Sequence, residues 1–190
     1  MKTKNFLLTG ALLIVALFSV NGVMAADPSN TDKVTVNIKF TPIQTIEVNG
    51  SQNVVNFVYD NIGTYQNGAE DQIKEKHLKI NSSGPFVVNV VSSGFTGGLA
   101  DKTIPASDVA VQVVIPSNTS LQYSGSGITG PLALSTTNEP LFTSTRGGMN
   151  LEFDVTYSNP GGKDGNYFEG YLKGDDVTYT AKVTYEIVAK

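Results

Sequence analysis

Apolar and polar residues alternate along much of this chain, and this period of two constrains its fold more than any other feature. The alternation is clearest over residues 33–40, 151–157 and 177–187, where an apolar side chain stands at every second position. Successive side chains of a β-strand point to opposite faces of the sheet. We therefore predict that each segment is a strand with one buried and one solvated face, and that 177–187 is the longest.

Shorter runs follow the same pattern, and clusters of Gly, Asn, Ser and Pro separate them. They predict further strands at 43–48, 54–59, 77–81, 86–92, 109–115 and 132–134. Only Glu70–His77 has a helix-like composition, and it is either one short helix or a charged loop that leads into a strand. No longer segment carries the period of a helix, so we expect one all-β domain over residues 26–190, an antiparallel β-sandwich of about eight to ten strands.

The first residues have the three-part pattern of a secretory signal peptide. Two lysines precede a mostly apolar run, Phe6–Val20, and the small residues up to Ala25 suit a cut before Ala26. The apolar run is shorter than the roughly 20 residues of a membrane-spanning helix. We expect residues 1–25 to be removed and the protein to be exported, to the extracellular space, the cell surface or the periplasm.

The charge and the residue types of the remaining chain exclude several classes of function. After a cut at residue 25, 11 basic and 17 acidic residues leave a net charge of −6, which argues against nucleic acid and anionic membranes as partners. The chain has no cysteine, so thiol catalysis, cysteine zinc sites and disulfides are excluded, and a single histidine excludes a histidine-rich metal site. We expect no cofactor and no metal.

Two weak candidates for catalysis remain, and neither has a supporting motif. His77, the sole histidine, has no nucleophile elbow to pair with, and we interpret it as a surface residue near the start of a strand. Glu152 and Asp154 could act as paired carboxylates in glycoside hydrolysis, but their spacing puts both on the solvated face of one strand. We therefore expect the protein not to be an enzyme.

Aromatic and oxygen-bearing residues gather in the Gly-rich connection 158–176. Its candidate ligand-binding residues are Asp164, Tyr167, Phe168 and Tyr171. Such a loop suits a carbohydrate or a calcium ion, but the spacing is not that of an EF-hand, because Phe168 occupies the fifth position of a loop that starts at Asp164. A secreted carbohydrate- or calcium-binding module is thus the alternative to a structural role.

The order of features along the chain resembles a known group of exported proteins. An alternating segment, Lys33–Phe40, leads into Thr41-Pro42-Ile43, and the chain ends on a second alternating run, Tyr179–Ile187. This order resembles the cysteine-free major subunits of alternate chaperone–usher fimbriae and related bacterial secreted domains of unknown function. The resemblance implies an incomplete immunoglobulin-like sandwich whose groove is filled by the N-terminal segment of the next subunit. The leading expectation is a non-enzymatic structural or adhesive surface protein, with a fimbrial-type subunit as its most specific form.

Lys33–Phe40 is the segment suited to strand exchange with other copies or other surface subunits. Its apolar side chains share one face of an extended chain, and they are Val34, Val36, Ile38 and Phe40. At about 25 cal/mol per Å² of buried apolar area, their insertion into a groove contributes on the order of 8 kcal/mol before ordering costs. The same strand could instead pair within its own sheet, and the sequence leaves both alternatives open.

Overall fold

The structure is a computed structural model that describes residues 32–115, 123–172 and 174–190. The expected signal peptide, residues 1–25, lies outside the described residues. The chain divides into two units, one that ends at Phe40 and one that spans Thr41–Lys190, and each is described by itself. Among the described residues, no helix has the length and the hydropathy needed to cross a membrane.

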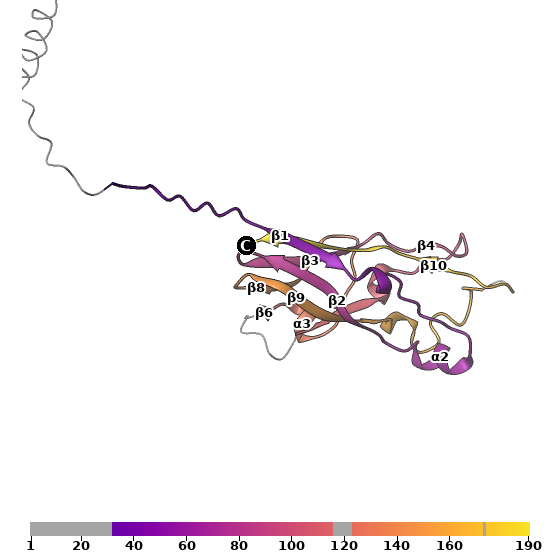
Figure 1. The fold of residues 1–190 in the computed structure, drawn as a ribbon. Coiled ribbons are helices and arrows are strands. Elements are labelled where there is room, and N and C mark those ends of the chain that lie inside the picture. The colour runs from indigo at the N-terminus through magenta and orange to yellow at the C-terminus, as the bar shows by residue number, and fades with distance from the viewer. Residues whose placement is uncertain (1–31, 116–122, 173) are drawn as a thin grey trace, which may run out of the picture. The chain divides into compact units, whose positions relative to one another are not determined.

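The second unit is built from antiparallel sheets (Figure 1). The larger sheet has the strand order β1 (Gln44–Val48), β2 (Gln72–Ser82), β9 (Gly148–Ser158), β5 (Ala110–Val114) and β7 (Leu132–Ala133). The second sheet has the order β11 (Val183–Ala189), β3 (Phe86–Ser92), β8 (Glu139–Ser144) and β6 (Tyr123–Ser124). A two-stranded ribbon pairs β10 (Tyr179–Thr180) with β4 (Thr96–Gly97).

In the part of the chain that the structure describes, helical structure is confined to short connections. The helices are α2 (Ile62–Asn67) and α3 (Ser126–Thr129), and single 3₁₀ turns occupy Gly50–Gln52, Ala106–Asp108 and Pro160–Gly162. Because every strand pair is antiparallel and strands dominate the described chain, the prediction of an all-β, sandwich-like fold is confirmed.

The core lies between the inward faces of the two larger sheets, as the sequence alternation requires. On β3 every second side chain is fully buried, from Phe86 through Val88 and Val90. Phe142 of β8 and Phe153 of β9 meet across this core with ring centroids 5.0 Å apart. Burial of such aliphatic and aromatic side chains is the main stabilising contribution available to a chain without disulfides.

Several predicted elements differ from the structure. Residues 70–77 form no helix, because β2 already begins at Gln72. Residues 54–59 show the expected alternation of exposure, and Val55 and Phe57 pack against the core, but they belong to no strand. The predicted long strand 177–187 is interrupted at residues 181–182, which separate β10 from β11. There the backbone of Lys182 forms hydrogen bonds with the N–H and the hydroxyl of Ser93. The two halves therefore join different partners, β4 and β3.

Candidate functional site

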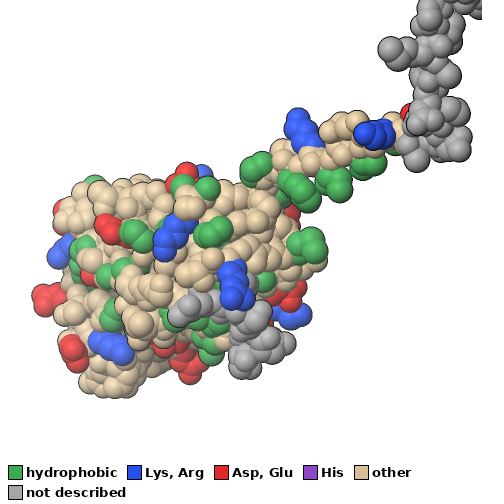
Figure 2. Space-filling model, turned by 90° about the vertical axis from the view of Figure 1, so that its left-hand side faces the viewer, with side chains coloured by type: hydrophobic (Ala, Val, Ile, Leu, Met, Phe, Trp, Pro, Cys, Tyr) green, Lys and Arg blue, Asp and Glu red, His purple; other side chains and the backbone are tan. Residues whose placement is uncertain are grey.

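The segment Lys33–Phe40 exposes all of its apolar side chains. Val34, Val36, Ile38 and Phe40 are between 76% and 88% exposed, and no strand is assigned to residues 32–40. The prediction of a half-buried strand in this segment is therefore wrong for this structure. Figure 2 shows hydrophobic side chains along one side of the extended segment and basic side chains on another. Such an exposed apolar strip is suited to pairing with a sheet, because only a β-strand places alternate side chains on one face.

β1 and β11 are edge strands, one in each of the two larger sheets. Each of these strands has only one hydrogen-bonded neighbour among the described strands, β2 and β3 respectively. Their inward-facing side chains, such as Ile46, Tyr185 and Ile187, touch the core but are only half-buried, whereas those of β3 are fully buried. The two strands lie near each other, with Cα atoms within 8 Å. This region is an open sheet edge with apolar side chains at its base.

A buried polar chain crosses the core beneath this edge. The Nε2 atom of His77 lies 3.0 Å from the hydroxyl of Tyr157, which lies 2.7 Å from the hydroxyl of Tyr185. The three residues come from β2, β9 and β11, so the chain links the two sheets. Burial raises the pKa of Tyr157 to about 12 and raises that of Tyr185 well above its usual value. Both hydroxyls therefore stay neutral and act as hydrogen-bonding groups.

His77 is a correction to the sequence analysis, which interpreted it as a surface residue. It is 2% exposed, and burial, followed by the charge of Lys74, lowers its pKa. The cause is a β-bulge that breaks the alternation of β2. Lys76 has φ of 50°, the register against β9 shifts between Lys74 and Leu78, and consequently His77 and Leu78 are both buried. Period-two reasoning cannot anticipate two neighbouring buried residues.

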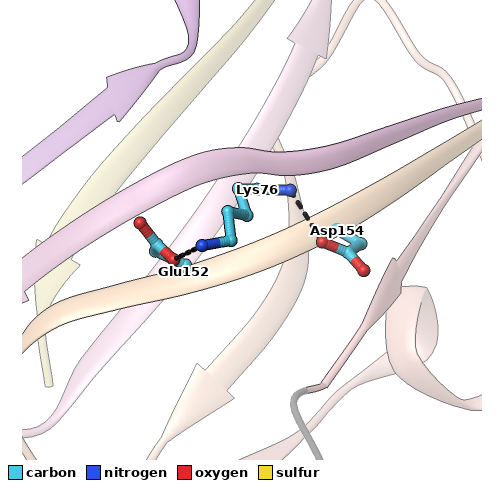
Figure 3. A network of polar contacts seen from close by, with 3 residues as sticks. All are labelled: Lys76, Glu152 and Asp154. Carbon is cyan, nitrogen blue, oxygen red and sulfur yellow. Dashed lines mark hydrogen bonds and ion pairs between the residues drawn. The ribbon is translucent and has the colours of Figure 1, made fainter.

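The bulge is held by the two carboxylates considered as catalytic candidates (Figure 3). The backbone N–H of Lys76 donates to Oδ1 of Asp154 at 2.7 Å, and its Nζ atom lies 3.0 Å from Oε2 of Glu152. Both acids lie on β9 and have contacts that fix the shape of β2. Glu152 also borders a shallow recess of about 280 Å³ in which Glu47, Lys76 and Lys79 supply charges of both signs. The arrangement is that of a structural clamp around a strained residue.

The candidate ligand-binding loop folds against α2 at the end of the domain remote from the C-terminus (Figure 1). The backbone N–H groups of Asp164 and Gly165 donate to the carbonyls of Gln66 and Tyr65, at 3.0 and 2.8 Å, and so satisfy carbonyls at the end of the helix. Asp164 and Phe168 thereby line one recess of about 510 Å³ together with Ile62, Tyr65, Gln66 and Gly165. Two of the four predicted residues share this site.

The other two predicted residues lie elsewhere. Tyr167 is 5% exposed, and its hydroxyl donates to Oδ2 of Asp108 at 2.7 Å, so its role is structural. Burial, with the added effect of the Asp108 carboxylate, raises the Tyr167 pKa far above its usual range. Tyr171 stacks between Tyr167 and Tyr179, and the Nζ atom of Lys102 lies 5.4 Å from its ring centroid. Neither lines the recess.

The calcium alternative gains no support from the described part of the chain. No three His, Cys, Asp or Glu side chains converge there in a way that could hold a metal ion. Among the described residues, Asp164 is the only acidic one that lines the recess beside α2. Calcium takes six to eight oxygen ligands, usually with several carboxylates, and a single carboxylate does not provide such a site.

Sequence reasoning missed two of the residues that line the recess beside α2. Tyr65 and Gln66 lie about a hundred positions from Asp164 in the sequence, and only the tertiary fold brings them together. The capping residue Asn61, which accepts from the N–H of Thr64, was the one local signal for α2.

No protein-family model matches this chain, and no curated protein matches it significantly in sequence.

Proposed function

We propose that this protein is a non-enzymatic, exported surface subunit that assembles by donating Lys33–Phe40 to the open β11 edge of another copy. The observation that carries the proposal is the coexistence of an unpaired apolar strip and an unpaired sheet edge in one chain. An extended segment that adds to a sheet edge gains main-chain hydrogen bonds, and its alternate side chains supply specificity. The partner is therefore a second copy of this chain or a surface subunit of the same design.

The strand order supports an immunoglobulin-like domain that lacks its last strand. Such domains pair strands A, B, E and D in one sheet and C, F and G in the other. The order β1, β2, β9, β5 fits the first set, and β3 beside β11 fits C beside F. In this assignment the position of G, outside β11, is empty among the described strands. One departure is β8, which pairs with β3 but follows β5 in the chain.

The half-buried side chains at the open edge support the same acceptor position. Ile46 of β1 and Ile187 of β11 pack against the core and still expose part of their surface. A strand placed beside β11 would cover this surface with its own apolar face. Exposed edges with apolar side chains also invite uncontrolled pairing, so a chain with this edge benefits from a dedicated occupant.

The test introduces a charge on the apolar face of the donor segment in the full chain. Val36→Asp and Ile38→Asp are expected to abolish assembly, because each would bury an unpaired carboxylate in the acceptor groove. The matched controls are Thr35→Asp and Asn37→Asp, which place the same charge on the opposite face and should assemble normally. Size-exclusion chromatography with light scattering measures the assembly state of each purified variant.

Stability provides the internal check on this experiment. The four side chains have no strand partner within the described chain, so the substitutions should leave the urea midpoint of the isolated protein unchanged. Assembly that survives both apolar-face substitutions, or that is lost equally in the polar-face controls, would contradict strand donation. A wild-type protein that remains monomeric at high concentration, even after denaturation and refolding in mixture, would also contradict it.

A further inference from the structure

We propose that the recess between α2 and the loop 164–168 binds a neutral pyranose saccharide, independently of strand exchange. Ile62, Tyr65, Gln66, Asp164, Gly165 and Phe168 line this recess of about 510 Å³. Small-molecule sites are concave, mostly apolar and furnished with a few polar groups that fix orientation, and their volumes fall between about 300 and 1,000 Å³. The recess is an open one whose volume falls in this range and whose lining combines apolar and polar side chains. It lies at the end of the domain remote from the C-terminus (Figure 1).

Its apolar wall is largely exposed to solvent. Phe168 is 62% and Ile62 is 66% exposed, and both belong to the same recess. A pyranose ring presents a face of C–H groups that packs on an aromatic or aliphatic surface, and aromatic rings bury a large area when covered. The chain has no tryptophan, so Phe168 and Tyr65 are the aromatic surfaces that this recess offers.

The aromatic wall is held rigidly by the rings behind it. Phe168 meets Tyr65 edge-on with centroids 5.4 Å apart, Tyr65 packs on Tyr59 at 5.4 Å, and Tyr59 packs on Tyr167 at 5.4 Å. Tyr167 is in turn anchored by its 2.7 Å hydrogen bond to Asp108. A platform fixed before binding loses little conformational entropy when a ligand arrives. This continuous packing distinguishes Phe168 from isolated exposed residues such as Met149, which is 84% exposed.

The polar groups of the recess match hydroxyls and reject anions. The carboxylate of Asp164 has no hydrogen bond or ion pair with a described side chain, and it accepts only, so it suits the hydroxyl donors of a sugar. The amide of Gln66, on the exposed end of α2, can both donate and accept. Among the described lining residues there is one carboxylate and no Lys or Arg, which disfavours phosphates, nucleotides and acidic sugars. A neutral saccharide fits the apolar wall and the polar groups together.

Asp164 also occupies a backbone conformation that few residues adopt. Its φ is 60°, and Gly165 beside it has φ of 74°. Asn and Asp tolerate this left-handed region better than most residues, and glycine tolerates it best. Asp164→Gly therefore removes the carboxylate without straining the backbone, and the variant should fold as the wild type does.

The experiment titrates the full-length wild-type protein with methyl β-galactoside, methyl α-mannoside, N-acetylglucosamine and lactose, and follows aromatic resonances by NMR. We expect one or more of these sugars to shift the Phe168 and Tyr65 signals saturably in the millimolar range. Phe168→Ala and Asp164→Gly should each weaken that binding at least tenfold. Met149→Ala is the control, since it removes an even more exposed apolar side chain outside the recess, and it should bind as the wild type does.

Three outcomes would overturn the saccharide site. The first is that none of the four sugars shifts these resonances up to tens of millimolar. The second is that cyclohexanol, which has an apolar ring but only one hydroxyl, shifts them as strongly as the sugars, which would make the recess a plain apolar patch. The third is that the variants retain a folded thermal transition and full sugar binding. None of these results bears on donor-strand assembly, which is measured by particle size.

Discussion

At the scale of single residues, His77 carries the clearest pH dependence. It is buried, its Nε2 atom is paired with Tyr157, and its Nδ1 atom is buried without a hydrogen-bond partner among the described residues. A protonated imidazole needs acceptors for two N–H groups, so this environment favours the neutral ring. Burial and Lys74 accordingly lower its pKa below the ordinary value of 6.5.

The consequence for stability follows from proton linkage. With a depressed pKa in the folded state, the unfolded chain binds the proton more readily as the pH falls through 6.5. The free energy of unfolding should therefore be greatest above pH 6.5 and decrease below it, by at most about 1.4 kcal/mol per pH unit for one proton. Urea denaturation between pH 7.5 and 5.5 measures this slope, in a range where exposed carboxylates remain ionised.

The control replaces the titrating ring. His77→Gln keeps a hydrogen-bonding side chain near Tyr157 but cannot titrate, so the variant should be less stable overall and should lose the slope between pH 7.5 and 5.5. An unchanged slope in this variant would assign the pH dependence to another group and would contradict the buried, neutral state of His77.

The clamp around Lys76 gives a second prediction at this scale. Asp154→Ala removes the acceptor of a backbone N–H in a residue with φ of 50°, whereas Glu152→Ala removes only an exposed ion pair with Nζ. Exposed ion pairs contribute little, whereas the charge-assisted hydrogen bond from Asp154 fixes the backbone of Lys76 in the bulge. We expect Asp154→Ala to lower the urea midpoint clearly more than Glu152→Ala does. Equal effects of the two substitutions would contradict this prediction, because they would show that the two acids stabilise the fold through their charge and not by holding the bulge.

At the scale of elements, the turn before β9 packs against the turn between β2 and β3. A methyl group on Gly147 would overlap the carbonyl oxygen of Ser82 and would lie 2.7 Å from the backbone nitrogen of Gly84. Gly147→Ala should therefore force the two turns apart and reduce the free energy of unfolding by about 1–3 kcal/mol, as overpacking does elsewhere.

Gly84 is the matched control for this prediction, because the same methyl group there meets nothing within 4 Å. Gly84→Ala should change the stability by no more than about 0.5 kcal/mol. Chemical denaturation of both variants at one pH tests the pair. A Gly147→Ala variant as stable as the wild type would mean that the two turns separate freely, and the close approach would then contribute nothing to the fold.

The elements also show where sequence reasoning succeeds and fails. The strand 86–92 was predicted to the residue, because a valine-rich run follows the Ser-Gly-Pro turn that marks its start. β8 was missed because Pro140 argues against a strand, yet the structure places it at a bulge, where Val88 pairs with Phe142 and Asn89 with Pro140. At a bulge the ladder of hydrogen bonds is already interrupted, so proline's missing N–H is tolerated there, and no local sequence pattern predicts the bulge.

The same limit applies to the candidate sites. The apolar strip of Lys33–Phe40 is visible in the sequence, since it is a local alternation. The sequence does not show that the strip lacks a partner strand, because an edge strand paired in its own sheet has the same pattern. The recess beside α2 combines Asp164 and Phe168, which were predicted, with Tyr65 and Gln66, which only long-range packing brings near them.

At the scale of the whole molecule, an open edge and a free strand make stability depend on a second chain. A ligand that binds only the folded state raises its free energy of unfolding by RT ln(1 + [L]/Kd), which is about 2.7 kcal/mol at a hundredfold excess over Kd. A peptide with the sequence of residues 33–40 is such a ligand if β11 is the acceptor. The receiving protein should carry Val36→Asp and Ile38→Asp, so that its own segment cannot compete.

We expect this peptide to raise the urea midpoint of the receiving protein in a concentration-dependent manner and to slow amide exchange along Val183–Ala189. A control peptide with Asp at the positions of Val36 and Ile38 should do neither, because it would bury carboxylates against Ile46 and Ile187. Tyr185, whose hydroxyl is paired within the core while its ring is half-buried, should lose its remaining exposure to solvent quenchers. Protection that instead appears along β7 or β6, the other outer strands of the two sheets, would contradict β11 as the acceptor and move the exchange site to the opposite side of the sandwich.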